Sequence, residues 1–198
     1  MGWFDWAKFY EEQVRALPHR ATIVEVGSFL GRSITYLAQT LKWYRKDLRL
    51  VAVDTFVGSE SDPIVLHTVA QEGGSLRRAF EANLHACDVQ DCIEVMAVDS
   101  VSAARQFADR SVDVVFLDGD HSYAGVTADL LAWLPKVTPC GYLAGHDIDT
   151  YASVGQAIAD VLGYEGVRID YSQNLWVFHN TPENQGRLNP KARTALGL

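Results

Sequence analysis

The sequence is poor in the residues and segments that mark several common classes of protein. It has only 3 cysteines, and Cys87, Cys92 and Cys140 form no CxxC pair. This pattern argues against a disulfide-bonded scaffold and predicts reduced thiols in a cytoplasmic protein. No stretch of about 20 apolar residues is present, which argues against a membrane span. The first ten residues, MGWFDWAKFY, lack the apolar core of a secretory signal.

Positive charge is also scarce. The chain has 17 Lys and Arg against 25 Asp and Glu, which gives a formal net charge of -8. Because binding to a nucleic-acid backbone needs a basic face, no nucleic acid is expected as the main partner. The hydrophobic fraction of 48% over 198 residues is enough for one globular domain with a substantial core. We predict a single domain over residues 1–180, with an N-terminal helix within 1–18, a core over 21–180 and a polar tail over 181–198.

Strand and helix patterns alternate along this core. Apolar, β-branched runs predict strands over Ala21–Val26, Leu48–Val53, Ile93–Val98, Val112–Leu117, Tyr142–Ala144, Val167–Ile169 and Leu175–His179. Helical spacing predicts helices over Asp5–Leu17, Ser33–Trp43, Ser75–Ala86, Ser100–Ala108, Tyr123–Leu134 and Val154–Leu162, with a short candidate helix over Ile64–Ala70. The first serines of the helices at 75 and 100 are candidate N-caps. The alternation indicates a parallel α/β sheet with helices on both faces, and the last two strands predict a hairpin.

The segment FLDGDHSY, residues 116–123, gathers chemically active side chains at the end of a buried strand. Asp118, Asp120 and His121 lie within four positions. Ligands of open α/β sheets bind at the carboxyl ends of the strands, where these residues fall. Carboxylates and an imidazole in that place can bind a metal, move a proton or hold a substrate hydroxyl.

A glycine-bearing turn follows the first strand. Gly27 and Gly31 are spaced as GxxxG, and not as the GxGxxG that cradles a dinucleotide pyrophosphate. The preceding acid, Glu25, suits a cationic ligand better than a phosphate. Asp54, at the end of the second strand, is placed to accept the hydroxyls of a ribose. Asp99 either helps to recognise an adenine or caps the helix that follows it.

These motifs together resemble the class I S-adenosylmethionine-dependent methyltransferases. EVGSFLGRS resembles their first motif, E/D-x-G-x-x-x-G, and VAVD resembles the second. The long segment from FLDGDHSY to GHD is similar to the methyltransferase domain 24 group, which is related to macrolide-sugar O-methyltransferases and cephalosporin-hydroxylase-type proteins. The resemblance covers about Ala21–His179. It implies a Rossmann-like fold with a seven-stranded, mostly parallel sheet whose last strand is antiparallel.

The resemblance also implies roles for particular residues. S-adenosylmethionine would be bound by Glu25, Gly27, Ser28, Gly31, Asp54, Asp99, Ser100 and Asp118. A divalent cation, Mg²⁺ or another, would be held by Asp118, His146 and Asp147. Because a histidine stands at position 146 and magnesium prefers oxygen ligands, the identity of the cation stays open.

The expected reaction is methyl transfer to the hydroxyl of a small metabolite. The acceptor oxygen must lose a proton, and His121 and His146 are the candidate bases, beside Asp118. The tetrapeptide [DN]-P-P-[YF], which suits the amino groups of nucleic-acid bases, is absent. Its absence favours oxygen over nitrogen as the acceptor atom. Candidate walls for the acceptor are the loop at 55–74 and several aromatic residues, namely Trp3, Phe4, Trp6, Tyr151, Tyr171 and Trp176.

Three other interpretations stay open. The aromatic start of the chain is a candidate contact with a second copy in a homo-oligomer. The nucleoside-binding features also fit an NAD-type dinucleotide-dependent oxidoreductase, although the GxGxxG motif is missing. A third interpretation is a non-catalytic nucleoside-binding or assembly protein.

Overall fold

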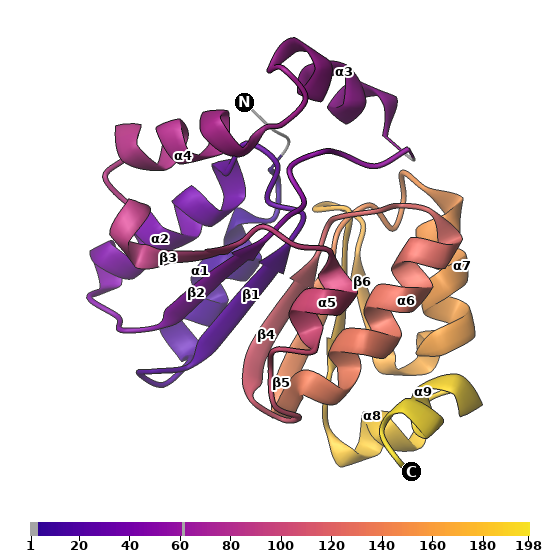
Figure 1. Cartoon of the computed structure of the whole chain (residues 1–198). Helices are drawn as coiled ribbons and strands as arrows, with labels where there is room; N and C mark the ends of the chain where they lie inside the picture. Colours follow the sequence, from indigo (N-terminus) through magenta and orange to yellow (C-terminus); the bar gives the residue numbers. More distant parts are fainter. Residues whose placement is uncertain (1–3, 61) are drawn as a thin grey trace.

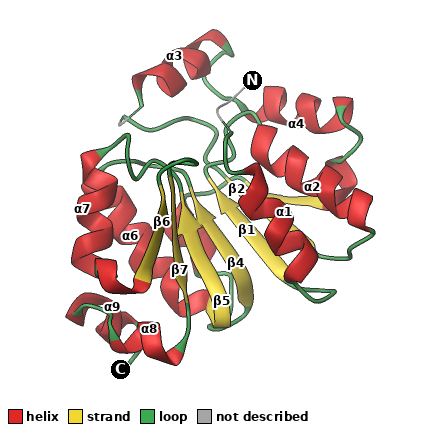
Figure 2. Ribbon diagram, turned by 180° about the vertical axis from the view of Figure 1, so that it is seen from behind, coloured by secondary structure: helices red, strands yellow, loops and turns green. Residues whose placement is uncertain are grey.

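One seven-stranded sheet organises the described part of the chain (Figures 1 and 2). The computed structural model describes residues 4–60 and 62–198. The strands are β1 (Thr22–Val26), β2 (Arg49–Val53), β3 (Ile93–Met96), β4 (Val112–Leu117), β5 (Val137–Gly145), β6 (Val167–Asp170) and β7 (Leu175–His179). Their order is β3-β2-β1-β4-β5-β7-β6, and β7 runs antiparallel to both of its neighbours. The predicted Rossmann-like sheet with an antiparallel last strand is confirmed.

Helices cover both faces of the sheet. On one face lie α1 (Ala7–Ala16), α2 (Arg32–Tyr44) and α4 (Arg77–Ala86), and on the other α5 (Ser100–Ala104), α6 (Tyr123–Trp133) and α7 (Ala152–Val161). Because side chains alternate along a strand, Ile23 of β1 joins the first core and Val24 joins the second. The α3 helix (Pro63–Gln71) lies beyond the carboxyl ends of the strands, as Figure 1 shows.

The strand order places a crevice between β1 and β4. These two strands are neighbours, yet the chain continues from β1 toward β2 and from β4 toward β5, on opposite sides. In open α/β sheets, ligands bind in the crevice outside the carboxyl ends at this switch point. The turn after β1 and the FLDGDHSY segment after β4 therefore meet there.

The fifth strand is longer than the sequence pattern predicts. The predicted strand begins only at Tyr142, whereas the Pro139-Cys140-Gly141 segment also lies inside β5, as an irregularity in its pairing with β4. Cys140 takes a left-handed backbone (φ 63°), and its N–H donates to the carbonyl of Asn180 at 2.9 Å. A bulge accommodates a proline, which has no N–H, without ending the strand.

Two predicted serine caps are wrong. The α4 helix begins at Arg77 with Leu76 as its N-cap, although the Ser75 hydroxyl accepts a 3.3 Å bond from the Arg77 N–H. The α5 helix spans only Ser100–Ala104, and its N-cap is Asp99, whose carboxylate accepts from the Ser102 N–H at 2.9 Å. A carboxylate one position earlier takes the capping place from Ser100.

Trp6, near the start of the described residues, and the C-terminal tail both pack against the body. Trp6 is only 1% exposed and belongs to the core, so the expectation that it forms a wall for the acceptor or a contact with a second copy is wrong. Trp3 lies outside the described residues. The tail forms α8 (Pro182–Gly186) and α9 (Pro190–Ala195), and Leu188 and Ala192 are buried against the core that α6 and α7 share. The division into a core and a tail stays a prediction. Among the described helices, none is long and apolar enough to cross a membrane.

Candidate active site

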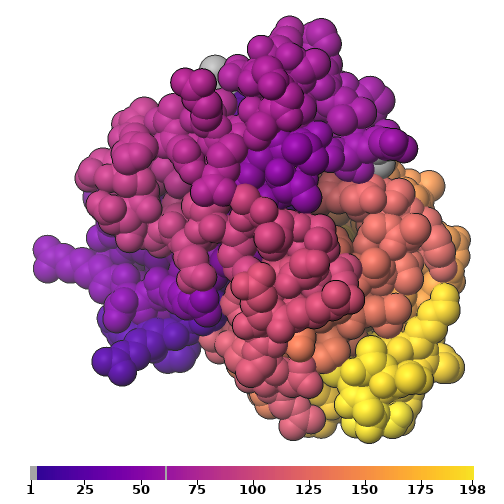
Figure 3. Space-filling model, viewed as in Figure 1, coloured from indigo at the N-terminus to yellow at the C-terminus, as the bar shows by residue number. Residues whose placement is uncertain are grey.

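A cavity of about 720 Å³ opens at the carboxyl ends of β1, β2, β4 and β5. Its size is typical of small-molecule sites. In Figure 3 the purple α3 segment overhangs this part of the surface, and Ile64 and Val65 of α3 contribute to the wall. Of the residues predicted from the sequence, Gly27, Ser28, Asp54, Asp99, Ser100, Asp118, His121, His146 and Asp147 line the cavity, and Glu25 and Gly31 do not.

Asp54 organises the end of the cavity beside the glycine turn. One carboxylate oxygen accepts a 2.8 Å bond from the Phe29 N–H, and the other accepts a 2.6 Å bond from the Phe56 N–H. Burial raises the pKa of Asp54, and the backbone N–H groups of Phe56, Phe29 and Ser28 oppose that effect. A carboxylate has about four lone-pair sites, so it can still accept a hydroxyl that enters the cavity.

The glycines of the turn are required by the protein itself. Gly27 has φ +87°, and a Cβ there would lie 2.0 Å from the carbonyl oxygen of Asp118. Gly31 has φ +82°, and its Cβ would lie 3.0 Å from the Phe80 ring. Both conformations favour glycine. Close approach between the turn, the end of β4 and α4 therefore requires both glycines. Gly27 also lines the cavity, and its expected approach to a ligand stays a prediction.

Glu25 points away from the cavity, which corrects its expected place beside the cofactor. It alternates with Val24 and Val26, so its side chain faces α1 on the other side of the sheet. There it is fully buried and accepts bonds from the Tyr10 hydroxyl at 2.6 Å and the Ser28 hydroxyl at 2.8 Å. Burial raises the pKa of Glu25 to about 7, against the opposing effect of these donors. Through Ser28, the carboxyl supports the turn from behind.

The adenine-side candidates lie at the start of α5. Asp99 caps the helix, and the Ser100 hydroxyl accepts a 2.9 Å bond from the Trp133 indole N–H. The buried carboxyl of Asp129, which the sequence reasoning missed, lines the same wall, and burial raises its pKa to about 6. The sequence does point to Asp129, because an acid within the apolar face of the predicted helix at 123–134 is unusual.

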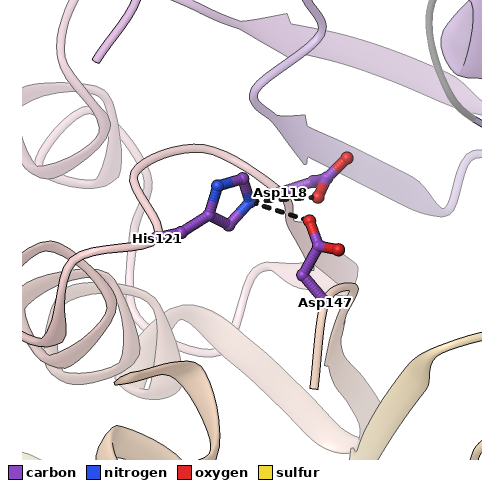
Figure 4. Close-up of side chains that lie close together, drawn as sticks. All are labelled: Asp118, His121 and Asp147. Carbon is purple, nitrogen blue, oxygen red and sulfur yellow. Dashed lines mark ion pairs between the residues drawn. The ribbon is translucent and has the colours of Figure 1, made fainter. Parts of the chain in front are cut away.

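The carboxylates and histidines after β4 and β5 converge. Figure 4 shows Asp118, His121 and Asp147 pointing toward one another. The Nε2 atom of His121 lies 3.1 Å from Asp147 Oδ2 and 3.6 Å from Asp118 Oδ1. The His146 Nδ1 atom lies 3.3 Å from Asp147 Oδ1 and 3.7 Å from Asp118 Oδ1. The sequence reasoning predicted this meeting of two strand ends.

The electrostatics of this group are strongly coupled. Burial alone would lower the pKa of His121, but Asp118 and Asp147 outweigh it and raise that pKa to about 10. The pKa of His146 is raised in the same way. Burial raises the pKa of Asp118, whereas the two histidines hold the pKa of Asp147 well below its usual value. At neutral pH the ligand-free group therefore carries protonated His121 against ionised Asp147.

The same group has the donors of a cation site. Asp118, His121 and Asp147 each offer a ligand atom, and these atoms lie within 4.8 Å of one another. Two carboxylates and an imidazole suit divalent metals such as Mn²⁺ or Zn²⁺ better than Mg²⁺, which prefers oxygen alone. The donor set thus fits a divalent cation, and the imidazole of His121 favours a transition metal over Mg²⁺.

Other residues near the group come from distant segments. Tyr151 stacks on His121, with ring centroids 4.4 Å apart and planes 8° apart. The Ser153 hydroxyl donates to the His121 carbonyl at 2.6 Å. Asp5, which no motif signalled, contacts His146. Of the other aromatic residues predicted as walls, Trp176 is buried in the core, and Tyr171 does not line the cavity.

Comparisons with known proteins agree with this architecture. A family model described as "Methyltransferase domain" matches residues 24–148, well over half of the chain. The protein belongs to this family of methyltransferase domains, whose cofactor is S-adenosylmethionine. The match runs from within β1 to just past β5 and includes most of the predicted site residues. It favours the methyltransferase interpretation over a dinucleotide-dependent oxidoreductase.

Individual relatives are more distant. The chain is 24% identical over 147 residues to R132, an uncharacterized protein of Acanthamoeba polyphaga mimivirus; the match covers 71% of this chain and 60% of R132. The solved structure of the O-methyltransferase NovP has a TM-score of 0.70 at 16% identity, over 89% of this chain and 80% of NovP. CalS11, a TDP-rhamnose 3'-O-methyltransferase of calicheamicin biosynthesis, has a TM-score of 0.58 at 20% identity, over 87% and 76%. These structures share the fold.

Proposed function

We propose that this protein transfers the methyl group of S-adenosylmethionine to a hydroxyl oxygen of a small-molecule acceptor. One observation carries the proposal: the group of Asp118, His121 and Asp147 lines the same cavity as Asp54 and the turn after β1. A donor site and an acid–base group thus share one chamber. The similarity of fold to two proteins described as O-methyltransferases supports oxygen as the acceptor atom.

The donor lies between the turn and the start of α5. Asp54 accepts the ribose hydroxyls, while Asp99 and Ser100 stand on the adenine side of the cavity. Ser28 lines the methionine side, and its hydroxyl is held by Glu25. The positive sulfonium suits a chamber whose lining carries many carboxylates. Methyl transfer is an in-line displacement, so these contacts act mainly by positioning the donor.

His121 takes the proton of the acceptor hydroxyl. Its position at the end of β4, with its Nε2 atom 3.1 Å from Asp147 and 3.6 Å from Asp118, supports this role. In the ligand-free protein those carboxylates keep the ring protonated at neutral pH, because its pKa is about 10. Positive charge placed beside the carboxylates lowers this pKa and frees the ring to act as a base.

Asp118 and Asp147 are the residues that would hold a divalent cation, with His146 beside them. His121 would stay outside this set, because an imidazole nitrogen that coordinates a metal has no lone pair left to take a proton. When bound, such a cation lowers the pKa of a coordinated hydroxyl and orients it. The acceptor itself packs against Tyr151, whose ring is stacked on His121. The walls of α3 and the loop before it complete the acceptor side of the cavity.

Incubation with S-adenosylmethionine carrying a labelled methyl group tests the proposal. A panel of hydroxylated sugars, phenols and amino alcohols serves as acceptors, and mass spectrometry locates the added methyl. We expect an O-methylated product and a lower rate after exhaustive chelation, restored by Mn²⁺ or Mg²⁺. Label found only on nitrogen or carbon would contradict the oxygen assignment. Full activity after chelation, together with no metal detected by elemental analysis, would contradict a role for a cation in the reaction.

A further inference from the structure

Asp5, just before α1, reaches a site residue that is 141 positions away in the sequence. Its Oδ1 atom lies 2.8 Å from the Nε2 atom of His146, at the end of β5. The His146 side chain is 8% exposed and the Asp5 side chain 55% exposed. The contact therefore joins a buried ring in the cavity wall to a carboxylate that water still reaches. Asp5 also lies outside residues 24–148, which match the family model.

The neighbouring tryptophan fixes the place of this carboxylate. Trp6 is buried, and its ring stacks on Phe116 with centroids 4.9 Å apart and planes 21° apart. The same ring packs on His146 at 4.5 Å between centroids. Because Trp6 is anchored in the core beside β4, the backbone at Asp5 cannot move far from His146. The ring of His146 thus has an aromatic face against it and a carboxylate at one edge.

The chemistry of the contact sets the orientation of the imidazole. An ionised carboxylate only accepts, so the Nε2 atom of His146 carries the hydrogen. The other ring nitrogen, Nδ1, then faces Asp147 and Asp118 at 3.3 and 3.7 Å. Histidines in metal and acid–base sites are commonly oriented in this way by a carboxylate on the remote nitrogen.

We infer that Asp5 is a positioning residue for His146, which it holds with Nδ1 turned toward the carboxylates of Asp118 and Asp147. Without Asp5, the ring can rotate about its side-chain bonds and present a different atom to the cavity. The segment before α1 therefore contributes a positioning residue to the site. Its consequence for methyl transfer rests on the proposed function, whereas the contact itself does not.

Ring-nitrogen NMR of ¹⁵N-histidine-labelled protein tests the contact directly, without metal, donor or acceptor. His146→Gln assigns the resonance among the 6 histidines. We expect a slowly exchanging Nε2 proton on His146 in the wild type. The proton should persist in Asp5→Asn, whose amide oxygen still accepts, and exchange rapidly in Asp5→Ala. A wild type without this protected proton, or an Asp5→Ala variant that keeps it, would overturn the inference.

A functional arm uses the same variants. Replacing a carboxylate that orients a histidine at a metal site typically changes metal affinity or activity by about 10- to 100-fold. We expect Asp5→Ala to weaken Mn²⁺ binding and lower kcat in that range, with KM for the donor unchanged and partial rescue in Asp5→Asn. Glu12→Gln is the matched control, because Glu12 lies on α1, is 54% exposed and contacts only Lys8 among the ion pairs of the described residues.

The outcomes separate the inference from the proposed function. If wild type transfers methyl groups and Asp5→Ala retains kcat and Mn²⁺ affinity within twofold, the positioning role is wrong and the function stands. If wild type binds neither donor nor metal but shows the protected proton that Asp5→Ala loses, the proposed function fails and the positioning of His146 stands. Equal melting temperatures for the variants exclude a general loss of folding.

Discussion

Replacing Glu25 with glutamine should stabilise the protein at pH 8 but have little effect at pH 5. Glutamine has nearly the same shape, its amide oxygen can accept from the Tyr10 hydroxyl, and its NH₂ can donate to Ser28. The substitution therefore removes a charge and keeps the packing. Glu25 is fully buried, and its pKa is raised to about 7 by that burial.

The size of the effect follows from proton linkage. A carboxyl with a raised pKa in the folded state binds protons more tightly there than in the unfolded chain, where its pKa is about 4.3. The stabilisation from this proton is complete at low pH and is lost as pH rises through about 7. Between pH 5 and pH 8 the loss in the wild type is about 2.5 kcal/mol, at 1.36 kcal/mol per pKa unit. Glutamine cannot titrate, so it escapes this loss.

Urea unfolding followed by circular dichroism at pH 5 and pH 8 measures the difference. Other titrating groups are shared by both proteins and cancel when the variant is compared with the wild type. The free energy of unfolding of Glu25→Gln, minus that of the wild type, should be about 2.5 kcal/mol more positive at pH 8 than at pH 5. Glu12→Gln, an exposed substitution of the same kind, is the control. A difference that does not change with pH would refute the burial of an ionisable carboxyl behind the turn.

The remaining predictions concern His121 and Gly27. His121→Gln should lower kcat by about 10²- to 10⁴-fold while calorimetry still detects the methyl donor. Because the pKa of His121 is about 10 in the ligand-free protein, wild-type kcat/KM should rise with pH from neutral into the alkaline range; a flat profile contradicts a histidine base. Gly27→Ala should lose more than about 3 kcal/mol of stability, because its Cβ would lie 2.0 Å from the Asp118 carbonyl. Gly186→Ala, whose Cβ meets nothing within 4 Å, is the control in thermal melts, and equal melts would contradict the crowding.

The sheet could be predicted because its signals are local. Val112–Leu117 is a buried apolar run, and the structure has β4 over the same residues. The acids that end β2 and β4 follow directly from where those strands stop, and so does their place at one edge of the sheet. The hairpin of β6 and β7 was also evident, since its loop is short.

The rest depends on contacts between distant residues. No local pattern tells that Glu25 faces α1, because β1 is buried on both sides and either register satisfies an apolar run. The bulge at Cys140 depends on how β5 pairs with the neighbouring strand β4, which the local sequence does not indicate. Asp5 contacts His146 only because the segment before α1 packs over the strand ends. The motifs at the strand ends do not indicate this contact. These contacts set orientation, and the sequence motifs set only residue type.

Calorimetric titration with S-adenosylhomocysteine, the product form of the donor, tests the central claim most directly. It asks whether the cavity beside Asp54 holds this nucleoside, whatever the acceptor. Wild-type protein should show saturable binding of one ligand per chain. Asp54→Ala should bind at least about 10-fold more weakly, since a hydrogen bond to a charged group contributes about 1.5–3 kcal/mol. No heat of binding at millimolar ligand, or equal affinity in the two proteins, would contradict the site described at the ends of β1 and β2.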